Sequence, residues 1–325
     1  MLNVLHPVAE SPKVSVIVPV YAVQEYVGKC AVSLFSQTWD NCEFIFVDDG
    51  TPDRSVDIIE KILDSDFPAV KPRVRILHEP NSGLPHARMT GLAAATGDFV
   101  IHVDSDDWVE PGYIEHLVRK AIEEDADAVY CDFYKEYPRK KPKLCAEGDF
   151  SPATGPMAVK SMHNSIIRGY MWNKLIRLSF YDLGSMYVPK WGYHEDLVFQ
   201  TQVLYKARKV VHLREALYHY RRRRRGALTT TSIVRTRKQS SENMFLLYDA
   251  LPKDSEPVRA CGEDILLRGG WYSACILNFR LLRAHPDAVR AILDMDYVHG
   301  CRVPVWKQHY TKFICRLLRL ENTSN

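Results

Sequence analysis

The chain has 325 residues, of which 46% are hydrophobic and 26% are charged, as in an ordinary soluble globular protein. Lys and Arg (43) barely outnumber Asp and Glu (40), which argues against a protein that binds nucleic acid. No apolar run approaches the about 20 residues that span a bilayer, and residues 1–12 lack the pattern of a signal peptide. We therefore expect a cytoplasmic protein. The eight cysteines are scattered, so no zinc or redox motif is expected.

Short apolar segments alternate with helical patterns through the first half of the chain. Strands are expected at Val14–Val18, Glu43–Val47, Val74–His78, Phe99–Val103 and Ala128–Cys131. Helices are expected at Tyr26–Gln37, Val56–Leu63, Leu84–Thr96 and Pro111–Glu124. Alternating strands and helices with short links predict right-handed crossovers. The fold class is therefore α/β, with a Rossmann-like, mostly parallel sheet flanked by helices.

The pattern changes after the fifth strand. From about Tyr134 to Pro156, Lys, Pro and Gly residues predict an exposed loop or a joint between subdomains. Beyond Thr231, apolar stripes at helical spacing predict a helical C-terminal extension. We therefore divide the chain into an α/β domain, residues 1–230, and a helical region, residues 231–325.

Two of the predicted strands end in carboxylates. Val47 runs into Asp48-Asp49-Gly50, and Val103 runs into Asp104-Ser105-Asp106-Asp107. Ligands bind where the carboxyl ends of strands leave an open parallel sheet, so these clusters should meet at one crevice. Carboxylates beside a glycine turn suit the ribose of a nucleotide and a hard divalent cation on its phosphates. The alternative is ordinary turn chemistry.

Six motifs follow one another between Val14 and about Thr230. They are Val16-Ile17-Val18-Pro19-Val20-Tyr21, Phe46-Val47-Asp48-Asp49-Gly50-Thr51-Pro52-Asp53, Asn81-Ser82-Gly83 with Ala87-Arg88, Asp104-Ser105-Asp106-Asp107, Trp172-Asn173-Lys174-Leu175 and His194-Glu195-Asp196. In this order they resemble family 2, the large family of inverting glycosyltransferases with the GT-A fold. The chain departs from the family at Ala22, where asparagine is usual.

The resemblance implies an activity for the domain of residues 1–230. It would be the catalytic domain of a hexosyl- or N-acetylhexosaminyltransferase. The enzyme would transfer a sugar from a nucleotide sugar, with a UDP-sugar expected, to a hydroxyl of a glycan or lipid-linked acceptor. The process implied is surface polysaccharide biosynthesis.

The resemblance also implies which residues bind the nucleotide sugar. They are Pro19, Tyr21, Glu25, Asp48, Asn81, Arg88 and Asp104. A carboxylate such as Asp48 can accept the imide N–H of uracil, and an exposed aromatic ring can cover a base. Arg88 could brace Asp48 or contact the nucleotide. The alternatives are a simple turn at Asp48, a solvated helix start at Glu25 and a helix-surface arginine at Arg88.

The pair Asp104-x-Asp106 is the metal motif that the resemblance implies. Asp106 would be the principal ligand of Mn²⁺ or Mg²⁺, and Asp104 would bind the ribose or the metal. Side chains two residues apart face alike while strand geometry persists, so both should project from one edge. The cation would stabilise the leaving diphosphate. A helix-capping acidic turn before Pro111 is the alternative.

The catalytic base is implied to lie in Glu195-Asp196. Inversion is a single displacement, so one carboxylate must take the proton of the attacking hydroxyl. We choose Asp196 as the base and Glu195 as a residue that positions the acceptor. A Glu-Asp pair at a helix start is also favoured by the helix dipole without any catalytic role.

The acceptor or diphosphate side is implied to contain Trp172, Lys174 and one or two arginines of the run 221–225, represented by Arg223. A tryptophan can stack on a sugar, although a buried core tryptophan is the more common case. An arginine can clamp a diphosphate, while its neighbours would be solvated or face anionic lipid.

Three alternatives stay open. A non-catalytic nucleotide- or glycan-binding module could keep this fold, and the arginine run could bind nucleic acid, which the near-neutral total charge disfavours. The segment Lys312–Leu320 mixes basic and apolar residues, as interfacial helices do. It could contact the inner face of the membrane or pack on the catalytic domain.

Overall fold

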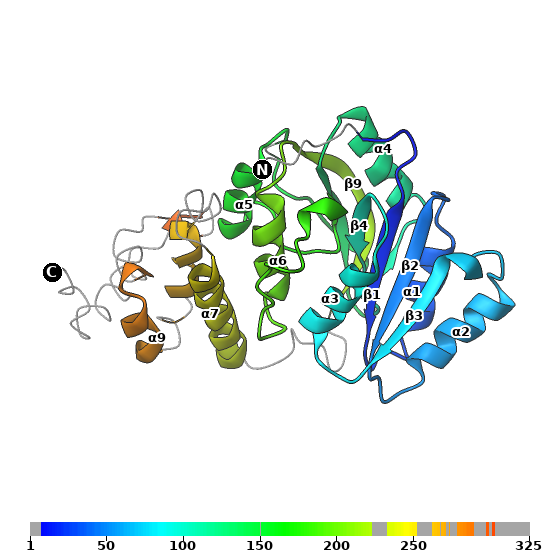
Figure 1. Ribbon diagram of the computed structural model, residues 1–325, viewed down its shortest axis with the longest axis horizontal. Coiled ribbons are helices and arrows are strands. Elements are labelled where there is room, and N and C mark those ends of the chain that lie inside the picture. The colour runs from blue at the N-terminus through cyan, green and yellow to red at the C-terminus, as the bar shows by residue number, and fades with distance from the viewer. Residues whose placement is uncertain are drawn as a thin grey trace. The chain divides into compact units, whose positions relative to one another are not determined.

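Figure 1 shows the computed structural model of the chain, an α/β protein built on a nine-stranded sheet. The structure describes residues 8–149, 151–222, 233–251, 262–266, 268–270, 273, 278–288, 297–298 and 301–302. The chain forms two compact units that interleave along the sequence. The first unit comprises Met1–Gly155, Tyr170–Met186 and Lys206–Arg224; the second comprises Pro156–Gly169, Tyr187–Tyr205 and Arg225–Asn325. The predicted domain boundary after residue 230 remains a prediction.

The sheet belongs to the first unit. Its strands are β1 (Val14–Val20), β2 (Cys42–Asp49), β3 (Val74–Glu79), β4 (Phe99–His102), β5 (Trp108–Val109), β6 (Ala128–Glu136), β7 (Lys143–Cys145), β8 (Lys174–Arg177) and β9 (Val210–Arg221). Their order is β3-β2-β1-β4-β8-β6-β9-β5, with β7 paired to β6. The strands β3, β2, β1 and β4 are parallel, and β8 runs antiparallel to β4 and β6. All five predicted strands are confirmed, with shifts at their ends.

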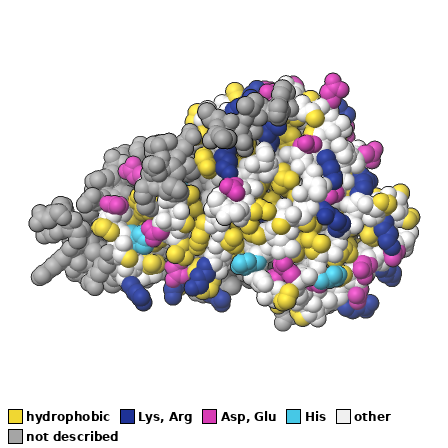
Figure 2. All heavy atoms as spheres, viewed as in Figure 1, with side chains coloured by type: hydrophobic (Ala, Val, Ile, Leu, Met, Phe, Trp, Pro, Cys, Tyr) yellow, Lys and Arg dark blue, Asp and Glu magenta, His cyan; other side chains and the backbone are white. Residues whose placement is uncertain are grey.

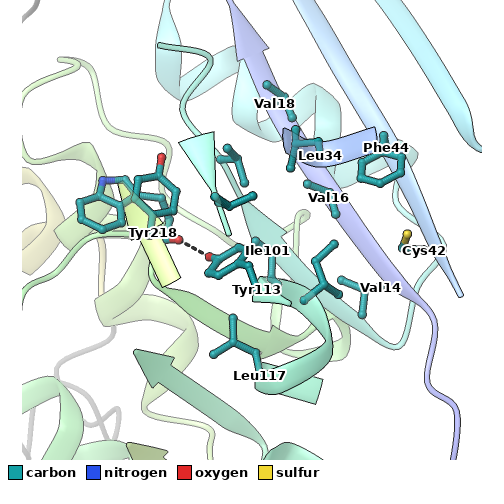
Figure 3. Packing of buried hydrophobic residues seen from close by; sticks show 14 of the residues in the cluster. Val14, Val16, Val18, Leu34, Cys42, Phe44, Ile101, Tyr113, Leu117 and Tyr218 are labelled. Atoms are coloured by element: carbon teal, nitrogen blue, oxygen red, sulfur yellow. Dashed lines mark hydrogen bonds between the residues drawn. The ribbon is translucent and has the colours of Figure 1, made fainter. Parts of the chain in front are cut away.

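Helices cover both faces of this sheet. They are α1 (Val27–Phe35), α2 (Ser55–Ser65), α3 (Leu84–Ala94) and α4 (Tyr113–Glu123), with 3-10 turns η1 (Lys71–Arg73) and η2 (Leu178–Phe180). Alternate residues of β1 (Val14, Val16 and Val18) pack into the main core with α1 and α4, as Figure 3 shows. On the opposite face, α3 packs against β1 and β2. The four predicted helices of this unit are thus confirmed.

The expected loop from Tyr134 to Pro156 is partly wrong. The strand β6 continues to Glu136, and β7 folds back on it so that Tyr134 lies opposite Leu144. The Lys- and Pro-rich residues 137–142 form the exposed connection of this hairpin. A polar composition is compatible with a strand here because β7 pairs with β6 alone among the described strands, and edge strands carry solvated side chains.

The second unit is mainly helical in its described part. Its elements are α5 (Gly155–His163), α6 (Glu195–Leu204), α7 (Ile233–Ala250), α9 (Phe279–Ala284) and a hairpin of β10 (Tyr297–Val298) and β11 (Cys301–Arg302). The helices α7 and α9 confirm the helical pattern predicted beyond Thr231. The segment Lys312–Leu320 lies outside the described residues. No helix in the described ranges is both long and apolar enough to cross a bilayer.

Candidate functional site

The two acidic turns lie at one edge of the sheet. Strands β2 and β4 flank β1 and run parallel to it, so Asp48 and Asp104 both leave the carboxyl edge, as the sequence predicts. Pro19 is buried in β1, whereas Tyr21 is 46% exposed and Glu25 is exposed. The Tyr21 ring is therefore partly open to solvent beside this edge. Oδ2 of Asp48 lies 2.9 Å from Nδ1 of His78 on β3.

Asp49 connects the turn after β2 to the predicted Asn81–Gly83 segment. Its buried carboxylate accepts the backbone N–H of Ser82 at 2.6 Å and of Gly83 at 3.0 Å. Gly50 has a φ of +62°, and a Cβ there would lie 2.8 Å from the backbone nitrogen of Asn81. Only glycine suits this turn. The exposed Asn81 side chain is thereby held near the carboxyl edge.

Arg88 is buried and is not exposed on the helix surface. Its side chain is 2% exposed, and its Nη2 lies 2.9 Å from Oδ1 of Asp104. The surface-arginine alternative is therefore wrong. The guanidinium that we expected to brace Asp48 or contact the nucleotide pairs with Asp104.

Three carboxylates gather in the loop after β4. One oxygen each from Asp104, Asp106 and Asp107 lies within 4.8 Å of the others. Asp104 and Asp106 are half-buried, and Asp107 is 1% exposed. Burial, with the charges of Asp106 and Asp104, raises the pKa of Asp107 well above its usual value. No role was predicted for Asp107 from the sequence, although its position directly after Asp106 is a usable signal.

The end of β9 holds this loop through Tyr218, for which no role was predicted, and Arg221, the first arginine of the run 221–225. The backbone N–H of Asp104 donates to the Tyr218 hydroxyl at 3.1 Å, and that hydroxyl donates to Oδ2 of Asp107 at 2.8 Å. The backbone N–H of Arg221 donates to Oδ1 of Asp107 at 2.7 Å, and its Nε donates to the Asp106 carbonyl at 2.8 Å. Tyr218 and Arg221 therefore fix the loop's conformation.

The first arginine of the run 221–225 is thus directed at the acidic loop. The Arg221 guanidinium lies 4.8 Å from the ring centroid of Tyr26 and 4.9 Å from that of Trp108. Nζ of Lys29 lies 3.1 Å from the Trp108 centroid. Burial and the charge of Arg221 lower the pKa of Lys29. Arg221 thus lies between the acidic loop and two aromatic rings, and Lys29 packs on one of these rings. Arg223, our representative of the run, lies outside the described residues.

Trp172 and Lys174 are core residues of the first unit. Trp172 is 3% exposed, and its indole stacks on the rings of Tyr170 and Tyr218. The distances between ring centroids are 4.5 Å to Tyr170 and 4.3 Å to Tyr218. Lys174 is 3% exposed, and its Nζ donates to the Tyr170 carbonyl and to Oδ1 of Asn173, each at 2.8 Å. The core interpretation therefore fits Trp172, which supports Tyr218 from behind.

The predicted base lies in the second unit, at the start of α6. His194 precedes the helix with a φ of 61°, and Glu195 and Asp196 form its first turn. Glu195 is 3% exposed, whereas Asp196 is half-buried. Oδ1 of Asp196 accepts the N–H of Leu197 at 2.8 Å. The helix start predicted from the sequence is confirmed.

Comparison with known proteins matches residues 15–157 to the model of glycosyl transferase family 2. Two Bacillus subtilis proteins that carry glycosyltransferase names are similar: EpsH is 35% identical over 217 residues and EpsJ 34% over 215. Residues 15–157 of the chain are thus similar to glycosyl transferase family 2. The matches cover 65% of this chain and 61% of EpsH and EpsJ. The chain thus spans less than two thirds of these relatives.

Solved structures confirm the GT-A fold of this chain. The crystal structure of S. aureus TarS 1-349 in complex with UDP-GlcNAc superposes with a TM-score of 0.65 at 20% identity, over 96% of this chain and 91% of that chain. The mannosyltransferase PcManGT from Pyrobaculum calidifontis, in complex with GDP-Man and Mn²⁺, gives a TM-score of 0.53 at 14% identity, over 98% of this chain and 90% of that chain. Asp48, Arg88 and the carboxylate cluster lie within the matched residues 15–157.

The surface seen in Figure 2 bears on the nucleic-acid alternative. Across the described part of that face, Lys and Arg are interspersed with Asp and Glu and do not form one basic stripe. Proteins that bind nucleic acid carry a clustered basic footprint. This face therefore lacks the feature that the alternative needs.

Replacing Tyr218 with phenylalanine tests whether β9 holds the acidic loop. The variant keeps the aromatic stack but loses the hydroxyl between Asp104 and Asp107, so we expect the free energy of unfolding to fall by about 1–3 kcal/mol. Urea denaturation measures this loss. Tyr220→Phe is the matched control, because that hydroxyl is partly exposed and accepts only from Arg222 among the contacts described. Equal losses in the two variants would contradict the proposed link.

Proposed function

We propose that this chain is a metal-dependent, inverting glycosyltransferase of family 2. It would transfer a sugar from a UDP-sugar to a hydroxyl of a glycan or lipid-linked acceptor, in surface polysaccharide biosynthesis. The observation that carries the proposal is the cluster of Asp104, Asp106 and Asp107 at the same sheet edge as Asp48. The structural neighbours support a nucleotide-sugar donor, since TarS was solved in complex with UDP-GlcNAc and with UDP, and PcManGT in complex with GDP-Man and Mn²⁺.

The carboxylate cluster fits a hard divalent cation. Its oxygens lie within 4.8 Å of one another, and carboxylate oxygen is the donor that Mg²⁺ and Mn²⁺ prefer. We assign Asp106 as the principal ligand and Asp104 as the second, while buried Asp107 keeps the loop in place. When bound, the cation would neutralise charge on the leaving diphosphate.

The nucleotide would lie over the carboxyl ends of β1 and β2. The exposed ring of Tyr21 can cover a base face, and the Asp48 carboxylate can accept the imide N–H of uracil. Pro19, Glu25 and Asn81 would form the surrounding walls. Arg88 would act through Asp104, because its guanidinium already pairs with that carboxylate.

In the proposed reaction the acceptor oxygen bonds to the anomeric carbon as the bond from that carbon to the diphosphate breaks. The acceptor proton passes to the Asp196 carboxylate, and UDP leaves with the electron pair of the broken bond. Glu195 would position the acceptor. The half-buried position of Asp196 at the start of α6 supports its role, since it leaves the carboxylate partly accessible.

A donor screen tests the proposal. UDP-sugars and GDP-mannose are added to the chain with Mn²⁺, with Mg²⁺ or with EDTA, and the melting temperature is measured. A ligand at 100 times its Kd should stabilise the native state by about 2.7 kcal/mol. We expect one UDP-sugar to stabilise most, with metal present, and to release UDP when glycan or lipid-linked acceptors are added. Stabilisation without UDP release for any acceptor would favour the non-catalytic binding module.

A further inference from the structure

The segment that leads into α6 is held by α7 within the second unit. Nδ2 of Asn243 donates to the carbonyl of Trp191 at 3.0 Å and to that of Tyr193 at 2.9 Å. Oγ of Ser240 lies 2.6 Å from Nδ1 of His194. Ser240 and Asn243 are fully buried, and residues three apart share a face of a helix. One face of α7 therefore contacts three of the residues that precede Glu195.

His194 has a backbone conformation that needs such support. It occupies the left-handed region, with φ 61° and ψ 24°, although it is not glycine. That conformation costs an ordinary residue about 1–2 kcal/mol, so it persists only where its surroundings determine it. The Tyr193 ring stacks on the His194 imidazole with 4.5 Å between the ring centroids, and Oγ of Ser240 contacts Nδ1 of this imidazole. The direction in which α6 starts thus depends on these contacts.

The two proposed catalytic carboxylates come directly after this residue. Asp196 Oδ1 already accepts from the N–H of Leu197, so the carboxylate is oriented by the first turn of α6. A shift at His194 would therefore move Glu195 and Asp196 together. A displacement of about 1 Å in a reacting group can cost about 100-fold in rate.

We propose that Ser240 and Asn243 are positioning residues that fix the Glu195–Asp196 turn for proton transfer. The inference rests on the proposed function, because it concerns Asp196 as the base. It places part of the catalytic apparatus in α7, beyond the predicted domain of residues 1–230. It also gives the C-terminal region a catalytic role that none of the sequence motifs indicates.

The neighbouring serine provides a matched control. Ser241 is as buried as Ser240 and lies on the same helix, but its Oγ donates to the Gly269 carbonyl at 2.8 Å and contacts Ser273. Each alanine variant therefore removes one buried hydroxyl from α7, and only Ser240→Ala removes the contact with His194. We expect both variants to lose similar stability in urea.

The kinetic prediction separates them. Ser240→Ala should lower kcat about 10- to 100-fold with little change in the donor KM or the Kd for UDP, whereas Ser241→Ala should keep kcat within about threefold. Ser240→Thr, which restores a hydroxyl, should recover much of the loss. Asn243→Asp, which removes both N–H donors, should reduce kcat further. Equal kcat values for Ser240→Ala and Ser241→Ala would overturn the catalytic part of the inference.

Hydrogen exchange tests the positioning without relying on activity. We expect the amides of residues 191–197 to exchange faster in Ser240→Ala than in Ser241→Ala, because His194 loses a contact only in the former. Equal exchange in the two variants would overturn the positioning itself. A wild-type chain that transfers no sugar would instead count against the proposed function, while the exchange result would still decide whether α7 holds the turn.

Discussion

Asp106→Asn is expected to abolish metal-dependent sugar transfer while the chain stays folded. Asparagine keeps the size of the side chain but removes the charge that we assign as the principal ligand of the cation. A bound divalent ion contributes several kcal/mol of charge stabilisation in the transition state, which corresponds to about 100- to 1,000-fold in rate. Initial rates as a function of Mn²⁺ concentration measure the loss of turnover. Calorimetric titration of Mn²⁺ in the presence of UDP measures the loss of metal binding.

The control for this variant is Asp66→Asn, at an exposed carboxyl just after α2. It makes the same chemical change far from the acidic loop in sequence and should leave rates, metal titration and melting temperature unchanged. Undiminished metal-dependent turnover by Asp106→Asn would remove Asp106 from the proposed site. Loss of turnover with an unchanged Mn²⁺ titration would assign Asp106 a role other than metal binding.

Asp196→Asn is expected to stop transfer and to spare the binding of UDP and metal. The amide cannot take the acceptor proton, and loss of a general base costs about 100- to 10,000-fold. Asparagine can still accept the N–H of Leu197 through its Oδ1, so the first turn of α6 should survive. Measurements of kcat, of the Kd for UDP and of the melting temperature separate the chemical effect from unfolding.

Full transfer by Asp196→Asn would eliminate this residue as the base, and Glu195→Gln would then be tested in its place. The variants Asp106→Asn and Asp196→Asn should also lose activity for different reasons. Asp106→Asn should lose the metal titration, whereas Asp196→Asn should retain it. Asp106 lies in the first unit and Asp196 in the second.

The sequence by itself determined the α/β framework and the order of its motifs. Val14–Val18 is almost entirely β-branched, and β1 is buried along its whole length in a parallel setting. The carboxylates after Val47 and Val103 were predicted to share one edge, and the parallel pairing of β2 and β4 with β1 confirms this. These features are local, because a short run of neighbouring residues is enough to encode a strand or a turn.

Only the tertiary structure decided which side chains hold the acidic loop and the segment that leads into α6. The hydrogen bond between Tyr218 and Asp107 joins residues 111 positions apart, and the Ser240–His194 contact joins residues 46 apart. Such pairs leave no periodic pattern in the sequence, since the distance between the two residues depends on how the whole sheet or two helices pack together. Burial is equally non-local. Arg88 and Trp172 belong to residue types that occur both at the surface and in cores, and only packing assigned both to the interior.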